Sequence, residues 1–222
     1  MISVEHSSNN YVVLLHGIGR TAQIMNKMGS YLGKQGYEVY NDNYQSTIFS
    51  INELANAIWE RIQIHCLDST KKLHFVGHSM GAIIIRLMIA RFQPKNIGRV
   101  VMLAPPNQGS YLVGFLKQFR FYKRWYGPAG QELAKQSKLL INLPTIDYEV
   151  GIIAGDRSID WLFSWFMLSG KNDGKLMVDE TKLVGMKDHI ILHATHTFMP
   201  SNSTVIEQTA YFLGHGEFKR GA

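Results

Sequence analysis

The sequence has little that could cross-link the chain or anchor it in a membrane. Its 222 residues include a single cysteine, Cys66, which excludes an internal disulfide framework. Cys66 follows an apolar helical stretch, so we expect a packed thiol and not a nucleophile. No apolar run approaches the roughly 20 residues that cross a bilayer as a helix. Residues 1–8 have neither a basic start nor an apolar stretch, so we expect no signal peptide and a cytoplasmic protein.

Acidic residues are also scarce. There are 17 Asp and Glu against 23 Lys and Arg, which gives a net charge of +6 and a sequence pI near 9.3. The basic residues are scattered apart from residues 117–124, and no nucleic-acid-binding signature is present, so we expect no nucleic-acid partner. A basic surface can also attract anionic lipid head groups, which leaves a peripheral contact with membrane lipid open. Ordinary solvation is the simpler interpretation.

What the chain does contain is an alternation of strand and helix patterns. Strands are predicted at 11–15, 37–40, 73–76, 98–103, 148–154 and 189–192. Helices are predicted at 22–35, from a capping box at 50–53 to about 65, after residue 79, and from a second capping box at 204–207. This alternation indicates an α/β fold, a mainly parallel sheet of about six strands with helices on both faces. We expect one domain, residues 1–222, with a small helical cap inserted at about 105–147.

One motif in this pattern carries chemistry. Gly77-His78-Ser79-Met80-Gly81 is a G-x-S-x-G sequence between a short apolar run and a helix-like run. This context is typical of a nucleophile elbow, in which a serine occupies a tight turn between a strand and a helix. Side chains at Gly77 and Gly81 would collide with neighbouring backbone there. The alternative is a glycine-rich turn between a strand and a helix, in which the serine has no catalytic role.

A second motif follows the first strand. The run Tyr11–Leu15 leads into His16-Gly17-Ile18-Gly19. With the elbow and this HG-x-G turn, the sequence resembles the α/β-hydrolase superfamily, and more closely its small lipase and esterase members. The resemblance covers residues 11 to about 214 and implies a reduced version of the usual eight-stranded sheet. It also implies that the backbone N–H groups of Ile18 and Met80 form an oxyanion hole, while His16 orients the loop.

The resemblance requires an acid and then a histidine after Ser79. Two aspartates compete for the first role. Asp156 closely follows a predicted strand, and Asp173 lies in a segment similar to the N-D-G-x-V sequence of lipase-like hydrolases. Three residues separate the glycine from the valine here, where the family usually has one. We favour Asp173 and keep Asp156 as the alternative.

Three histidines compete for the second role. His196 lies just past the last predicted strand and is the expected base, whereas His193 lies within the run that begins at His189, and His189 lies at the strand entrance. The three could also suggest a metal site. Residues four apart on a strand lie about 13 Å apart, so His189 and His193 cannot share one ion, and we expect no metal.

These assignments imply a serine hydrolase that cleaves carboxylic esters. Ser79 would attack the carbonyl carbon, His196 would transfer the proton, and Asp173 would hold the imidazole, without a cofactor. The aromatic residues of the cap and of 159–168 favour small-molecule or lipid esters as substrates. The side chains or backbone expected to contact substrate are those of His16, Gly17, His78, Trp161 and Phe198.

Three other functions fit the same sequence. An acyltransferase or thioesterase would use the same three residues with another acyl acceptor or leaving group. A peptidase would need a peptide-shaped cleft, for which the sequence gives no sign. A non-catalytic lipid-binding scaffold is the alternative outside enzymes. The oligomeric state does not follow from the sequence.

Overall fold

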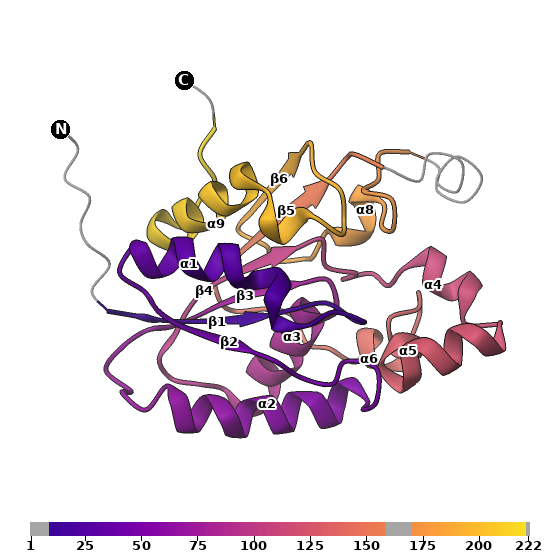
Figure 1. The fold of residues 1–222 in the computed structure, drawn as a ribbon, viewed down its shortest axis with the longest axis horizontal. Coiled ribbons are helices and arrows are strands. Elements are labelled where there is room, and N and C mark those ends of the chain that lie inside the picture. Colours follow the sequence, from indigo (N-terminus) through magenta and orange to yellow (C-terminus); the bar gives the residue numbers. More distant parts are fainter. Residues whose placement is uncertain (1–8, 159–169, 221–222) are drawn as a thin grey trace.

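The computed structural model of the protein describes residues 9–158 and 170–220 (Figure 1). These residues form a six-stranded sheet in the order β2-β1-β3-β4-β5-β6, and every neighbouring pair is parallel. The strands are β1 Tyr11–Leu15, β2 Glu38–Asp42, β3 Leu73–His78, β4 Ile97–Leu103, β5 Val150–Gly155 and β6 Asp188–Leu192. The predicted α/β class, the parallel pairing and the number of strands are confirmed.

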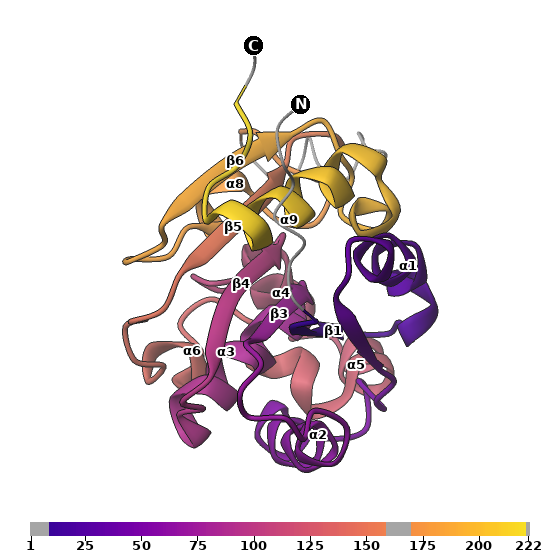
Figure 2. The same cartoon turned by 90° about the vertical axis from the view of Figure 1, so that its left-hand side faces the viewer.

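Helices cover both faces of this sheet (Figure 2). On one face lie α1 (Asn26–Lys34) and α9 (Ser203–His215), and on the other lie α2 (Ile51–His65) and α3 (Met80–Phe92). Successive residues of a strand point to opposite faces. Val12 and Leu14 therefore pack in the cluster that includes α1 and α9, whereas Val13 and Leu15 pack in the cluster of α2 and α3.

The strand order reverses next to β1. The chain first adds β2 on one side of β1 and then crosses to add β3 on the other. In open α/β sheets, ligands bind outside the carboxyl ends of the strands at such a reversal. The carboxyl ends of β1 and β3 lead into the HG-x-G turn and the elbow, respectively.

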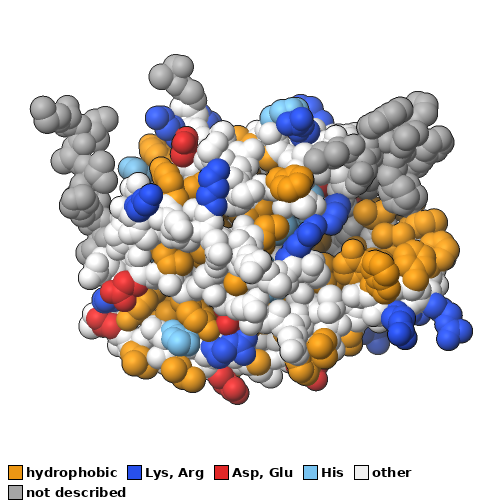
Figure 3. Space-filling model, viewed as in Figure 1, with side chains coloured by type: hydrophobic (Ala, Val, Ile, Leu, Met, Phe, Trp, Pro, Cys, Tyr) orange, Lys and Arg blue, Asp and Glu red, His pale blue; other side chains and the backbone are white. Residues whose placement is uncertain are grey.

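Between β4 and β5 the chain forms short helices beside the carboxyl edge of the sheet (Figure 1). They are α4 (Tyr111–Leu116), α5 (Arg120–Glu132) and α6 (Lys138–Ile141), and they lie in the segment where the cap is predicted. Hydrophobic side chains gather on this part of the surface, at the right of Figure 3. Gly127 bends α5 with a φ of 59°, and a Cβ there would lie 1.8 Å from the carbonyl oxygen of Thr47.

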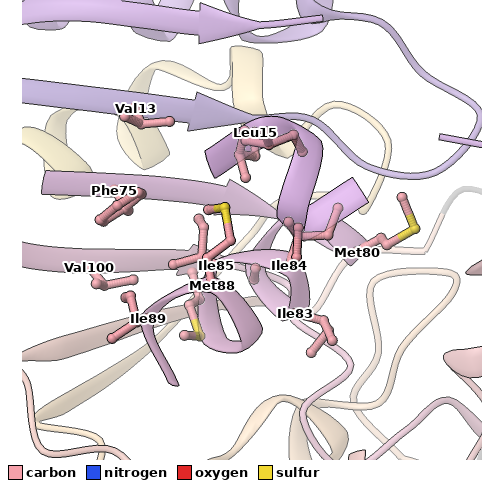
Figure 4. Close-up of a cluster of buried hydrophobic side chains, with 14 of the residues drawn as sticks. Val13, Leu15, Phe75, Met80, Ile83, Ile84, Ile85, Met88, Ile89 and Val100 are labelled. Atoms are coloured by element: carbon pink, nitrogen blue, oxygen red, sulfur yellow. The ribbon is translucent and has the colours of Figure 1, made fainter. Parts of the chain in front are cut away.

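The core on the α3 side is built around a helix that is apolar on nearly all sides. Ile83, Ile84, Ile85 and Met88 are fully buried, and Figure 4 shows them beside side chains of β1, β3 and β4. A helix that is apolar all round belongs in the interior. The elbow therefore rests on one of the most buried elements of the described chain.

Three predicted boundaries need correction. The predicted helix 22–35 is a 3₁₀ turn, η1 (Ala22–Met25), followed by α1. The second capping box is wrong because α9 begins earlier, at Ser203, where the side chain of Asn202 accepts the N–H of Val205 at 3.2 Å. Strand β2 lies slightly later than predicted.

Two further short helices complete the fold, α8 (Val178–Thr181) and η2 (Met199–Ser201). Within the described ranges, no helix is long and apolar enough to cross a membrane.

Candidate active site

Ser79 occupies a strained turn between β3 and α3. Its φ of 54° and ψ of −119° lie outside the regions that a residue with a side chain ordinarily adopts. Its N–H donates to the carbonyl oxygen of Leu103 in β4 at 2.8 Å, which holds the turn against the neighbouring strand. Backbone strain of this kind persists where the surroundings fix it, and it clusters at functional sites.

The two glycines of the motif permit this turn. A Cβ at Gly77 would lie 2.6 Å from the backbone nitrogen of Ala82. A Cβ at Gly81 would lie 2.4 Å from the carbonyl oxygen of Leu15. Both distances are too short for any side chain, so the close approach of α3 to β3 and β1 requires glycine at both positions.

His196 is hydrogen-bonded to Asp173. Its Nδ1 lies 2.7 Å from Oδ2 of Asp173, and both side chains are buried. The other carboxylate oxygen, Oδ1, accepts the backbone N–H groups of Lys175 at 3.0 Å and Leu176 at 2.8 Å. The carbonyl oxygen of Asp173 also accepts the N–H of His196 at 3.0 Å. Several bonds thus fix the carboxylate against the imidazole and leave Nε2 of His196 for another partner.

The other candidate acid and bases have different partners. Asp156 lies 3.1 Å from Nδ1 of His193, at an exposed position. His189 Nε2 lies 3.1 Å from the hydroxyl of Thr181. The described chain therefore contains two separate Asp–His pairs, and only the pair of Asp173 and His196 is buried.

The HG-x-G turn is held by His16 and Tyr44. Nδ1–H of His16 donates to the carbonyl oxygen of Gly17 at 2.9 Å, and Nε2 accepts the N–H of Tyr44 at 3.4 Å. The rings stack with their centroids 4.0 Å apart, and the Tyr44 hydroxyl donates to the carbonyl oxygen of His16. Burial lowers the pKa of His16, which favours the neutral form that these bonds need. This supports the expectation that His16 orients the loop.

His78 joins the elbow to the loop of His196. Its Nε2–H donates to the carbonyl oxygen of His196 at 3.0 Å, and the ring centroids are 5.0 Å apart. Burial, and next the nearby His196, lower the pKa of His78 well below its usual value. Nδ1 of His78 is buried and has no hydrogen-bond partner among the described residues.

Ser79 and His196 line one cavity of about 150 Å³. Gly17, Ile18 and His78 also line it. Much of the remaining wall is apolar and comes from the segment between β4 and β5, with Leu112, Val113, Leu116, Tyr122, Tyr126 and Leu133. Such a wall suits an apolar group next to the serine hydroxyl.

Two predicted contact residues lie elsewhere, and a third is not described. His16 is completely buried and does not line the cavity. Phe198 is 59% exposed and borders a separate depression with His193. Trp161, with the rest of the aromatic stretch 159–168, lies outside the described residues.

Comparison with known proteins identifies the family and the fold of the chain. The family model described as palmitoyl protein thioesterase matches residues 11–142, well over half of the chain. This chain belongs to the palmitoyl protein thioesterase family. The match covers the HG-x-G turn, the elbow and most of the cap segment, but not Asp173 or His196. No curated protein matches the sequence.

Solved structures similar to this family member share its fold at low sequence identity. The mature lipase BlEst2 of Bacillus licheniformis superposes with a TM-score of 0.72 at 16% identity, covering 95% of both chains. The thioesterase RedJ of Streptomyces coelicolor gives 0.59 at 15% identity, covering 95% of this chain and 91% of its own. Phospholipase PlaB of Legionella pneumophila gives 0.67 at 15% identity over 78% of this chain, which spans only 44% of that protein. The fold is that of the α/β-hydrolases, and the resemblance to lipases and esterases is confirmed.

Sequence reasoning missed several residues of the site in this thioesterase family member. Arg20 and Lys175 line the cavity and directly follow the HG-x-G and N-D-G sequences, respectively, and this adjacency is the signal that could have found them. Glu180 is buried and accepts the N–H of Tyr111 at 2.7 Å and of Met177 at 3.0 Å. It links the start of the cap to the segment that follows Asp173. Burial raises the pKa of Glu180.

Proposed function

We propose that this protein is a serine hydrolase that cleaves carboxylic esters of apolar acyl groups through Ser79, His196 and Asp173. The observation that carries the proposal is the meeting of Ser79 and His196 in one largely apolar cavity. The imidazole there is hydrogen-bonded to a buried carboxylate at 2.7 Å. A nucleophile, a base and a group that orients the base are the parts that this chemistry needs.

The roles follow from the contacts. With Asp173 holding Nδ1–H, Nε2 of His196 takes the proton of Ser79 as Oγ attacks the carbonyl carbon. The negative charge that develops on the carbonyl oxygen is stabilised by the backbone N–H groups of Ile18 and Met80. The leaving alcohol takes the proton from His196. Water then attacks the acyl-enzyme in the same way and releases the acid.

The cap segment, about residues 105–147, supplies the acyl site in this proposal. The side chains of α4 and α5 that line the cavity are apolar or aromatic. Each buried methylene group contributes about 0.8 kcal/mol to binding. We expect kcat/KM to rise with acyl length until the cavity is filled and then to level off or fall.

A thioesterase is the second candidate, and the family match over residues 11–142 favours it. The same three residues would act, and only the leaving group would change from an alcohol to a thiol. Oxygen esters and thioesters of the same acyl chain distinguish the two. The larger kcat/KM at equal chain length identifies the preferred leaving group.

The test uses p-nitrophenyl esters from acetate to palmitate with four proteins. Wild type should be active, and Ser79→Ala should be inactive. Asp173→Asn should lose about 10⁴-fold in kcat, as expected when the histidine loses its orienting carboxylate. Asp156→Asn is the matched control, because its carboxylate pairs with His193 instead, and it should keep the wild-type rate.

Four results would contradict the proposal. Activity that survives in Ser79→Ala removes the serine mechanism. Loss in Asp156→Asn with activity kept in Asp173→Asn reverses the choice of acid. No turnover of any ester or thioester, with lipid bound, favours the non-catalytic scaffold. An added alcohol that captures the acyl group at the expense of water identifies an acyltransferase. The cytoplasmic location stays a prediction from the sequence.

A further inference from the structure

The cap carries a set of aromatic side chains that point away from the cavity. Tyr111, Phe115, Phe119, Phe121 and Trp125 are between 41% and 73% exposed, and we call them the cap aromatic patch. The ring centroids of Phe115 and Phe119 lie 5.4 Å apart, and those of Phe119 and Phe121 lie 5.7 Å apart. The three phenylalanine rings thus contact one another, and hydrophobic side chains gather at this end of the molecule, at the right of Figure 3.

Cations are interleaved with these rings. Lys117, Arg120, Lys123 and Arg124 are exposed, and residues 111–131 contain no Asp or Glu. Among the described residues, none of the four pairs with a carboxylate. Part of the positive charge behind the net charge of +6 therefore lies on the surface that also exposes the aromatic rings.

Helices α4 and α5 each have one face that lines the cavity and another that is exposed to solvent. Tyr122 is buried and lines the cavity, whereas the neighbouring Phe121 is 59% exposed. Leu116 lines the cavity, whereas Phe115 belongs to the patch. The patch thus lies on the outer side of the wall that encloses Ser79.

We propose that the cap aromatic patch docks on the surface of an anionic lipid bilayer. Aromatic side chains partition to the membrane interface, where the ring is buried among lipid and polar groups stay wet. Lys and Arg near an anionic surface each add about 1 kcal/mol of attraction. Exposed aromatic residues with interleaved cations, on short helices, have the composition of interfacial membrane-binding segments.

Two other occupants fit less well. A second copy of the chain, docked patch to patch, would bring four cations against four cations, which costs free energy. Single-stranded nucleic acid needs ring faces that are free for base stacking. The rings of Phe119 and Phe121 instead stack on each other, and Phe115 contacts Phe119 in an edge arrangement.

The test is co-sedimentation of the full chain with vesicles, in the Ser79→Ala background so that no lipid is cleaved. Vesicles of phosphatidylcholine alone are compared with vesicles containing one part phosphatidylglycerol in four. We expect binding to the anionic vesicles that weakens as salt is raised, and little binding to the neutral ones. Because the readout is binding by an inactivated chain, the result does not depend on the proposed hydrolase activity.

Two sets of variants locate the surface. The first is a triple variant in which Arg120, Lys123 and Arg124 are replaced by Gln. It should weaken binding about 100-fold, because it removes three cations that each contribute about 1 kcal/mol. The triple variant with Phe119, Phe121 and Trp125 replaced by Ser should also weaken binding to the anionic vesicles. The matched controls are exposed residues elsewhere, Lys34, Lys95 and Lys219 to Gln and Ile64, Leu67 and Val184 to Ser. The controls should bind as the parent does. Thermal unfolding checks that each variant is folded.

Four outcomes overturn the proposal. The first is equal binding to neutral and anionic vesicles, and the second is equal loss in the controls. The third is a dimer, seen by analytical ultracentrifugation and lost in the aromatic variant, without vesicle binding. The fourth is binding of a single-stranded oligonucleotide, lost in the same variants, without vesicle binding.

Discussion

Replacing Gly81 by alanine should disturb the site from a position that contacts no substrate. The added Cβ would lie 2.4 Å from the carbonyl oxygen of Leu15, 2.7 Å from that of His16 and 2.8 Å from the carbonyl carbon of Leu15, whereas ordinary contact begins at 3.4 Å. All three atoms are backbone, so no side chain can rotate away. Helix α3 and strand β1 would have to separate by about 1 Å to restore ordinary contact.

This separation has two expected consequences. Overpacking a close-packed interior costs about 1–3 kcal/mol, which for a domain of this size lowers Tm by roughly 2–12 °C. The HG-x-G turn at the end of β1 would also move relative to Ser79 at the start of α3. A misplacement of about 1 Å between reacting groups can cost on the order of 100-fold in rate. We expect kcat/KM on a short ester to fall by about that factor.

Gly114→Ala is the matched control. Its Cβ would meet no heavy atom within 4 Å, and its position inside α4 has no positive φ. Alanine in a helix interior is favoured over glycine by about 0.5–1 kcal/mol, so this variant should be slightly more stable than wild type. Urea unfolding and ester hydrolysis of both variants provide the measurement. If Gly81→Ala is as stable and as active as Gly114→Ala, the close approach of α3 to β1 does not limit the site.

Two other predictions concern the titration of His74, which is buried, and Cys66, which is half-buried. Burial lowers the pKa of His74 to about 4 from 6.5, so the unfolded chain binds the extra proton and stability falls as the pH falls through this range. Between pH 8 and pH 5, the free energy of unfolding of wild type, measured in urea, should fall by about 2 kcal/mol more than that of His74→Asn. Asn is the suitable replacement because its side chain can still accept the N–H of Arg99. Equal losses in the two proteins would refute the prediction. Burial raises the pKa of Cys66 to about 11, so roughly one thiol in a thousand is ionised at pH 8. Iodoacetamide should label Cys66 far more slowly in the native protein than in urea, as read by mass spectrometry, and fast native labelling would contradict this.

The parts of the fold that follow from local sequence were predictable. All five residues of β1 are buried, as its unbroken apolar run indicates for a strand covered on both faces. The elbow was predictable because its glycines are required by backbone contacts that any strand, turn and helix of this geometry would make. Both features depend on residues that lie next to one another in the chain.

The parts that depend on loops returning from a distance were not predictable. Asp156 and Asp173 both follow β5, and only the path of the chain decides which one reaches His196. Phe198 was expected at the substrate because it follows His196 closely, but residues in a turn have no fixed side-chain periodicity, and this ring faces solvent. The start of α9 was missed because Asn202 and Thr204 are both suitable N-caps, with Asn the better one.

His78 explains how the two ends of the site meet. Ser79 follows β3 and His196 follows β6, and β4 and β5 lie between these strands. Neighbouring strands are nearly 5 Å apart, so the loop after β6 has to return across the carboxyl edge of the sheet to reach the cavity. The bond from Nε2–H of His78 to the carbonyl oxygen of His196 links this loop to the residue preceding Ser79. Burial favours the neutral imidazole at position 78, so in the proposed mechanism no second positive charge would lie beside His196 when it takes up a proton. We therefore propose a positioning role for the second residue of the G-x-S-x-G sequence, which the motif alone does not specify.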